Sequence, residues 1–98
     1  MNYRFNPLAL EELKAAGQYY ESRRPGLGAR FLAEVNTSIQ RVLESPNRWW
    51  EIQPGFRKHR LHHFPYGLIY HVVNDDLLEI DALAHSSRRP GYWRHREQ

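Results

Sequence analysis

The sequence predicts a single α+β domain covering residues 1–98, with its elements in the order strand, helix, helix and three further strands. In the first half, apolar residues recur at three- and four-residue steps, which is the spacing of an amphipathic helix. In the second half, aromatic and β-branched residues dominate, which is typical of strands. We therefore expect a two-helix antiparallel hairpin packed on an antiparallel sheet of about four strands, followed by a short C-terminal tail.

The first half begins with a short strand and continues as two helices. Residues 2–5 alternate polar and aromatic side chains, which indicates a strand. Asn6 can cap a helix and Pro7 suits the first helical position, so the first helix is predicted from Pro7 to Arg23. After a Pro-Gly break, apolar residues at helical spacing extend over 31–43. The short connection favours an antiparallel hairpin.

The second half is predicted to form three strands, Phe56 to His63, Tyr66 to Val73 and Leu77 to Ala84. A polar Asn-Asp-Asp turn joins the last two strands into an antiparallel hairpin. The middle strand is apolar on both sides, which indicates a central place in the sheet. The chain leaves the sheet at Ser86, and Arg94 to Gln98 are expected to be solvated.

Composition excludes several classes of protein. The 98 residues contain no cysteine, so disulfides, thiolate metal sites and cysteine nucleophiles are all excluded. No stretch approaches the roughly 20 apolar residues of a membrane span, and no signal-like segment follows Met1. We expect a cytoplasmic protein that does not contact the membrane and carries no cofactor.

The positive charges are placed unevenly. The net charge is only +3, yet residues 57–63 and 85–96 are rich in Arg and His and contain no acidic residue. Two basic segments predict a polyanion or an acidic protein as partner. The alternative is a solvated basic face that only keeps the protein soluble.

Two segments resemble the RelE/ParE superfamily of toxins from bacterial type II toxin-antitoxin systems. These are FRKHRLHHFPYGLIYHVV, residues 56–73, and EIDALAHSSRRPGYW, residues 79–93. The first has the FPY entry into an apolar strand that is common in ParE-like members. The second is similar to their last strand, which ends in H-x-x-R-x-P before an aromatic residue. The chain is closer to the ParE-like, plasmid-stabilisation branch, and the likeness extends over nearly its whole length.

The resemblance implies a small toxin that a cognate antitoxin neutralises in a toxin-antitoxin hetero-oligomer. ParE-like members inhibit growth by acting on DNA gyrase, so gyrase is the inherited target. RelE-like members cut messenger RNA on the ribosome, so the alternative is a metal-independent mRNA endoribonuclease with ribosome and mRNA as partners. A third alternative is a non-toxic member that only binds an antitoxin. The resemblance leaves open whether the chain is an enzyme.

The ribonuclease alternative would use basic and aromatic side chains to activate a ribose hydroxyl and hold the phosphate. The candidate catalytic residues are Lys58, Arg60, His85, Arg88 and Tyr92. In RelE-like enzymes an arginine follows the first tyrosine of the central strand, but here that place is taken by Gly67. This departure favours the ParE-like reading. His85 could act as an acid or base, or it could hydrogen-bond a backbone group and fix the tail.

A protein surface would use exposed side chains instead. The candidates for an effector or antitoxin surface are Arg57, Arg88, Arg89, Tyr92 and Trp93.

Two further groups of residues bear on binding. Trp49 and Trp50 point opposite ways on an extended segment, so one is expected in the core and the other at an interface. His59, His62 and His63 are not expected to bind a metal, because only two of them share a strand face and their basic neighbours would repel a cation.

Overall fold

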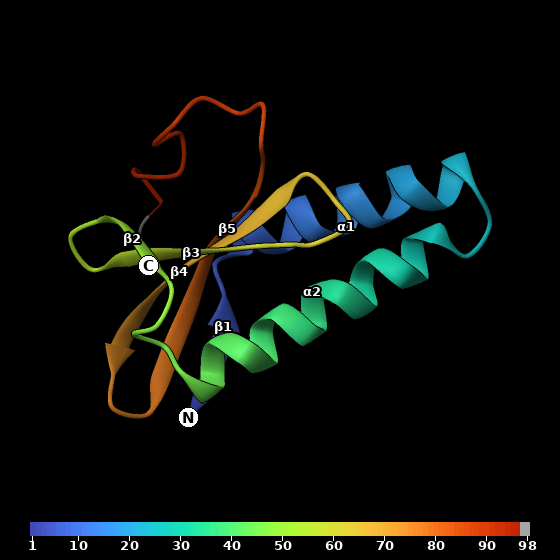
Figure 1. Ribbon diagram of the computed structural model, residues 1–98. Coiled ribbons are helices and arrows are strands. Elements are labelled where there is room, and N and C mark those ends of the chain that lie inside the picture. Colours follow the sequence, from blue (N-terminus) through green and yellow to red (C-terminus); the bar gives the residue numbers. More distant parts are fainter. Residues whose placement is uncertain (97–98) are drawn as a thin grey trace.

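The computed structural model describes residues 1–96 and contains one five-stranded sheet with a helical hairpin on one side (Figure 1). The chain follows the expected order except for one additional strand. Its elements are β1 (Asn2–Phe5), α1 (Pro7–Arg23), α2 (Leu27–Glu44), β2 (Trp50–Gln53), β3 (Phe56–Arg60), β4 (Tyr66–Asn74) and β5 (Leu77–His85). Within the described residues, neither helix is long and apolar enough to cross a membrane.

The two helices begin and turn where the sequence indicated. The Asn6 side chain accepts a hydrogen bond from the backbone N–H of Leu8 at 2.9 Å, and the following proline opens α1. In the connection, the Glu21 carboxylate accepts hydrogen bonds from the backbone N–H groups of Gly26 and Gly28. These bonds satisfy donors at the start of α2 that have no partner within the helix. The predicted hairpin is confirmed.

The sheet differs from the prediction in two respects. Its order is β1-β5-β4-β3-β2, so it has five strands, and β1 runs parallel to β5 while the other pairs are antiparallel. The chain returns from β1 to β5 through both helices and three strands, which leaves room for a parallel neighbour. The strand missed from the sequence, β2, has only four residues and a register shift between Glu51 and Gln53, so its side chains do not alternate regularly.

Apolar residues of the sheet divide between its two faces. Leu68 and Tyr70 of β4, with Leu78, Ile80 and Leu83 of β5, pack under the helices against the buried residues Phe31, Val35, Ile39 and Val42 of α2. Ile69, between Leu68 and Tyr70, lies on the opposite face with Ala82, Ala84, Tyr92 and Trp93. Because β4 is covered on both faces, the prediction of a central strand is confirmed. The second face is covered by the C-terminal segment 86–96, which arches over the sheet in Figure 1.

A carboxylate on α1 ties this segment to the sheet. Glu12 accepts two hydrogen bonds from the Arg96 guanidinium at 2.8 Å and one from the Tyr92 hydroxyl at 2.7 Å. It also accepts the backbone N–H of Leu83 at 3.0 Å. Burial would raise the pKa of Glu12, but these donors outweigh burial and hold the pKa below its usual value.

The expectation that Arg94 to Gln98 are solvated was wrong for Arg96. Its side chain is 8% exposed and lies in the ion pair with Glu12, because the guanidinium finds a carboxylate and the backbone oxygen of Asp81. Arg94 and His95 are exposed as expected. Residues 97 and 98 lie outside the described part of the chain.

Candidate functional site

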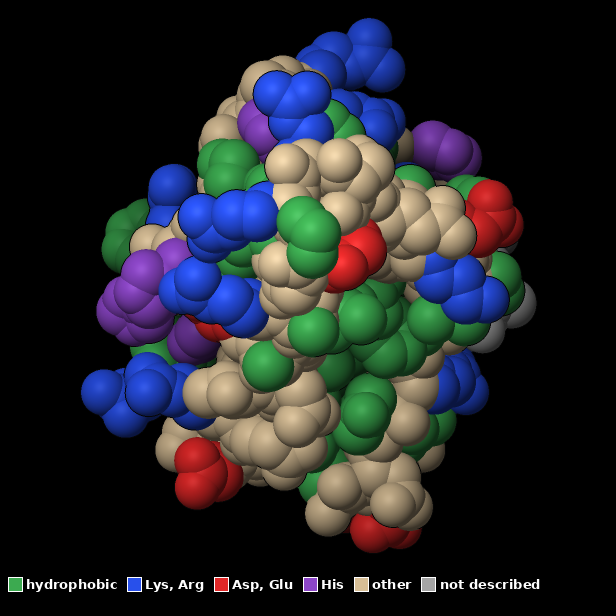
Figure 2. All heavy atoms as spheres, turned by 90° about the vertical axis from the view of Figure 1, so that its right-hand side faces the viewer, with side chains coloured by type: hydrophobic (Ala, Val, Ile, Leu, Met, Phe, Trp, Pro, Cys, Tyr) green, Lys and Arg blue, Asp and Glu red, His purple; other side chains and the backbone are tan. Residues whose placement is uncertain are grey.

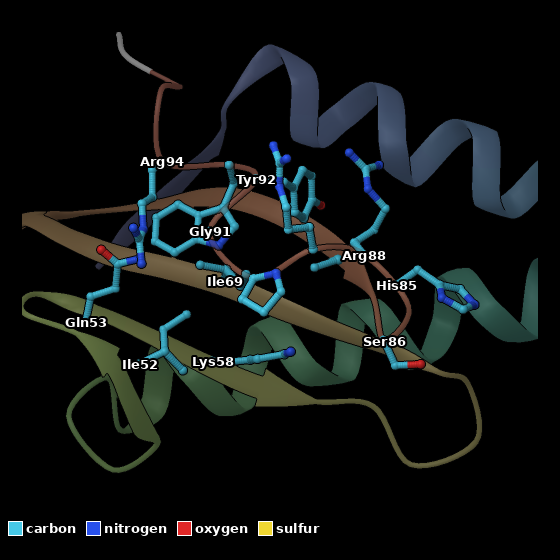
Figure 3. A pocket seen from close by; sticks show the side chains of 14 residues that line it. Ile52, Gln53, Lys58, Ile69, His85, Ser86, Arg88, Gly91, Tyr92 and Arg94 are labelled. Atoms are coloured by element: carbon cyan, nitrogen blue, oxygen red, sulfur yellow. The ribbon is translucent and has the colours of Figure 1, made fainter.

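A cavity of about 220 Å³ lies between the C-terminal segment and the sheet (Figure 3), and we call it the basic hollow. The side chains of Ile52 and Ile69 rise from the sheet, and Gly91, Tyr92 and Arg94 overhang it from the C-terminal segment. Gly91 has a φ of +78°, a conformation that favours glycine and lets the segment turn back over the sheet. The remaining lining residues are Gln53, Lys58, Ala84, His85, Ser86, Arg88, Arg89, Pro90 and Trp93.

Lys58 lies along the β3 side of the basic hollow, with its ammonium end directed toward Ser86 in Figure 3. It crosses Gly67 of the neighbouring strand so closely that a Cβ at Gly67 would lie 2.3 Å from Lys58 Cε. The missing side chain at Gly67 therefore makes room for this lysine. Burial, and then the nearby charge of Arg60, lower the pKa of Lys58.

The basic hollow is lined by cations that have no counter-ion among the described residues 1–96. Lys58, Arg88, Arg89 and Arg94 line it, no acidic residue does, and none of the four makes an ion pair within residues 1–96. Figure 2 shows Lys and Arg side chains over the upper and left-hand parts of one face, where acidic side chains are few. The hollow is therefore suited to a negatively charged group.

Tyr92 and Trp93 are held inside the second face. The Tyr92 ring lies between two guanidinium groups, 3.9 Å from Arg88 and 5.0 Å from Arg96, and burial followed by its bond to Glu12 raises the pKa of its hydroxyl. The Trp93 ring packs 4.9 Å from Phe56. Both residues are candidates for a partner surface, and the structure buries most of both rings against the apolar face of the sheet.

His85 lies where the last strand ends. Its Nδ1 accepts a hydrogen bond from the backbone N–H of Ser87 at 3.0 Å, and its ring meets Tyr66 edge-on at 5.0 Å. The histidine thus fixes the start of the C-terminal segment, as the structural alternative required. His85 and Arg88 also line a second hollow, of about 230 Å³, between α1 and the sheet. The other residues of this α1 hollow are Glu12, Ala15, Ala16, Tyr19, Tyr66 and Leu83.

Four of the five candidate catalytic residues meet at the basic hollow: Lys58, His85, Arg88 and Tyr92. Arg60 does not line it and instead borders a neighbouring hollow with Trp50, Ile52 and Lys58. Lys58 and Arg60 nevertheless share one strand face, as their spacing predicted.

The expected partner surface is brought together only in part. Arg88 and Arg89 are exposed beside the basic hollow. Arg57 lies on the opposite face of β3 from Lys58, where its guanidinium donates to the backbone oxygen of Trp49 at 2.8 Å. Trp50 is 78% exposed, whereas Trp49 packs partly buried against the helix-side core. This matches the expected division between the two tryptophans.

Sequence reasoning missed Glu12, Ile52 and Arg94 as site residues. Glu12 is separated from Arg96 by 84 positions, so no local pattern links them. Three other histidines are engaged elsewhere: His59 bonds to Ser38, His63 to Glu34 and His71 to Asp81. Within residues 1–96 no group of three or more histidines and carboxylates is arranged to hold a metal ion.

Comparison with known proteins identifies the family. The model of the ParE toxin of the type II toxin-antitoxin system parDE matches residues 3–90. The chain belongs to the ParE toxin family. The fold is similar to a solved chain of the chromosomal ParDE toxin-antitoxin system from P. aeruginosa, with a TM-score of 0.74 and 16% sequence identity. That match covers 87% of this chain and 95% of the other. No curated protein matches this ParE family member at a significant level.

Proposed function

We propose that this ParE family member is a growth-inhibiting toxin that acts through protein contacts, with DNA gyrase as its target. A cognate antitoxin neutralises it in a cytoplasmic toxin-antitoxin hetero-oligomer. Family membership supports the toxin-antitoxin part of this proposal. One observation favours protein contacts over RNA cleavage. The hydroxyl of Tyr92, which lines the basic hollow, already donates a hydrogen bond to Glu12.

Cleavage of RNA needs a group that takes a proton from the ribose hydroxyl and another that returns one to the leaving oxygen. The Tyr92 hydroxyl already donates to Glu12, and its raised pKa opposes loss of the proton. His85 Nδ1 is occupied by Ser87, and the arginine position of RelE-like enzymes is Gly67. The hollow thus has cations to attract an anion, while its phenol is bound to Glu12 and resists loss of its proton.

A protein-contact mechanism needs exposed groups that a target can cover. Trp50 is 78% exposed at the edge strand β2, and Arg88 and Arg89 project from the exposed start of the C-terminal segment. Tryptophan and arginine are the residue types most often responsible for affinity at protein interfaces. These residues are the proposed points of contact with gyrase.

Two assays on the purified chain test the proposed target. In a gyrase supercoiling assay, we expect supercoiling to fall as the chain is added and to recover when the neighbour-encoded antitoxin is added. In a translation extract, we expect transcripts to stay intact. Unchanged supercoiling at a concentration that stops growth would contradict gyrase as the target.

The ribonuclease alternative is favoured by one observation, which is that Lys58, His85 and Arg88 line the same hollow. If it holds, the translation extract shows new transcript ends and Lys58→Met abolishes them. The non-toxic alternative predicts that strong expression leaves growth unchanged while antitoxin binding persists.

A further inference from the structure

We propose that a hollow of about 340 Å³ on β2 and β3, at the edge of the sheet, is a site for single-stranded DNA. We call it the edge hollow, and it is lined by Trp50, Ile52, Lys58 and Arg60. A base stacks on the indole of Trp50, and the adjoining phosphates meet the two cations. The inference rests on the proposed function in one respect, because the strand is part of the DNA that gyrase holds where Trp50 contacts the target.

The pairing of the two strands places the ring beside the charges. Trp50 lies opposite Lys58 in the register of β2 and β3, and Ile52 follows on the same strand. Arg60 is two residues beyond Lys58, about 7 Å along β3, so its side chain emerges on the same face. Figure 3 shows Ile52 and Lys58 next to each other on this face. One flat ring, one aliphatic side chain and two cations thus border a single hollow.

The ring of Trp50 is available to a ligand. Trp50 is 78% exposed, whereas the neighbouring Trp49 packs against the helix-side core and has the Arg48 guanidinium 4.9 Å from its ring. Among the residues that the structure describes, no aromatic ring and no cation stacks on Trp50. Exposed aromatic rings hold single strands by stacking on bases, and every base can stack in this way.

The two cations of the edge hollow can take up a phosphate. Within residues 1–96, neither Lys58 nor Arg60 makes an ion pair, and no acidic residue lines the hollow. The carboxylate of Glu51, on the same strand as the ring, is occupied by the backbone N–H of Gly55 at 3.0 Å. Burial, and then the charge of Arg60, lower the pKa of Lys58, so an arriving anion stabilises the protonated lysine. A phosphate brings that negative charge.

The side chains of the edge hollow favour DNA over RNA. An indole, an aliphatic side chain and two cations line it, and none of these side chains carries a hydrogen-bond acceptor. A ribose 2′-hydroxyl placed among them loses water and finds no side-chain acceptor for its proton, which is unfavourable. A deoxyribose has no such group and can lie on Ile52. A nucleotide also suits the hollow better than an acidic peptide, because each unit joins a flat ring to an anion.

The site is tested on the purified chain without gyrase or antitoxin. Fluorescence anisotropy measures the binding of a labelled single strand of DNA of about 12 nucleotides at several salt concentrations. Trp50→Ala removes the ring, Trp50→Phe keeps a smaller ring, and Arg60→Gln removes one charge. Arg30→Gln removes an exposed charge on α2 and is the matched control. A thermal melt of each variant confirms that it is folded.

The ring and the charge are expected to have different effects. Trp50→Ala should weaken binding by about tenfold at every salt concentration, and Trp50→Phe should recover most of that loss. Arg60→Gln should weaken binding and also reduce the slope of log affinity against log salt by about 0.7, because one phosphate fewer is neutralised. Arg30→Gln should leave the affinity within about twofold, since its charge is screened from the strand. An RNA of the same sequence should bind more weakly than the DNA.

Four results would each overturn the DNA site. The first is no binding of the strand by about 100 μM chain, the weak end of the range for non-specific contacts. The others are unchanged affinity in Trp50→Ala, an unchanged salt slope in Arg60→Gln, and RNA that binds as tightly as DNA.

The proposed function fails separately from the DNA site. If the chain leaves supercoiling by gyrase unchanged but binds the strand with the expected effects, gyrase is overturned as the target and the site remains. If the chain inhibits gyrase but binds no strand, only the DNA site is overturned.

Discussion

The two faces of the sheet are covered in different ways. The helix face is closed by the apolar stripes of α1 and α2, where Phe31 of α2 and its neighbours pack on Leu68 and Tyr70 of β4. The other face is closed by the irregular segment 86–96, which contributes two aromatic rings and is tied down by charged hydrogen bonds to Glu12. The first face is built for stability, whereas the second also holds the cations of the basic hollow. The face that holds the basic hollow therefore depends on a few specific polar contacts, whereas the helix face depends on apolar packing.

The largest expected effect comes from the helix face. Phe31 is completely buried, so Phe31→Ala should lower the free energy of unfolding by about 3–5 kcal/mol through lost apolar contact and a cavity. Urea denaturation measures the change. Leu8→Ala, at a position that is 42% exposed, is the control and should stay within about 0.5 kcal/mol of wild type. Equal effects of the two substitutions would contradict the assignment of this core.

A smaller effect is expected on the other face. Glu12→Gln removes the charge that holds Arg96 and Tyr92, and we expect a loss of about 1.5–3 kcal/mol in the free energy of unfolding. Amide hydrogen exchange should rise in residues 86–96 more than in α2. In a double-mutant cycle with Arg96→Met, the two losses should be less than additive, because each single change breaks the same pair. Additive losses would show that the two side chains act independently.

The second face should also respond to pH through His71. A hydrogen bond from His71 to the Asp81 carboxylate, at 2.8 Å, outweighs burial and raises the pKa of the imidazole above 6.5. The stabilisation is therefore complete below about pH 6.5 and is lost as pH rises through the raised pKa of the folded state. Unfolding free energies measured between about pH 5 and about pH 8 for wild type and His71→Asn test this. Their difference should shrink as pH increases, and a constant difference would contradict it.

The smallest expected effect is at the sheet edge. Trp50 is 78% exposed, so Trp50→Ala should change the free energy of unfolding by less than about 0.5 kcal/mol. Trp93→Ala, which removes a ring that is 4% exposed, should cost several times more. Thermal melts of the two variants give the comparison. A large loss from Trp50→Ala would place this residue in the core instead of at a contact surface.

The elements of the helix face could be predicted from the sequence, because the patterns that indicate them lie within short stretches of the chain. Helical spacing, the Asn6-Pro7 start and the apolar run of β4 each depend on neighbouring residues, and each element was found. The parallel pairing of β1 with β5 was missed, since it joins residues about 75 positions apart, as Asn2 pairs with Leu77.

The site was predicted less completely for the same reason. Lys58, His85 and Arg88 stood out by residue type and do meet at one hollow. The burial of Tyr92 and Trp93 was not foreseen, because an aromatic pair in a basic, Pro-Gly-containing segment looks like exposed chain. What decided their position was the apolar outer face of β4 and β5, together with a carboxylate on the first helix.

The contact between Glu12 and Arg96 also has a consequence for synthesis of the chain. Glu12 is made early and its partner is the ninety-sixth residue, so the clamp can close only after translation of the described chain is nearly complete. Until then, the outer face of the sheet lacks Tyr92, Trp93 and the roof of the basic hollow. Domains begin to fold while they are being made. A partner that recognises this hollow therefore requires a chain that has been synthesised at least as far as Arg96.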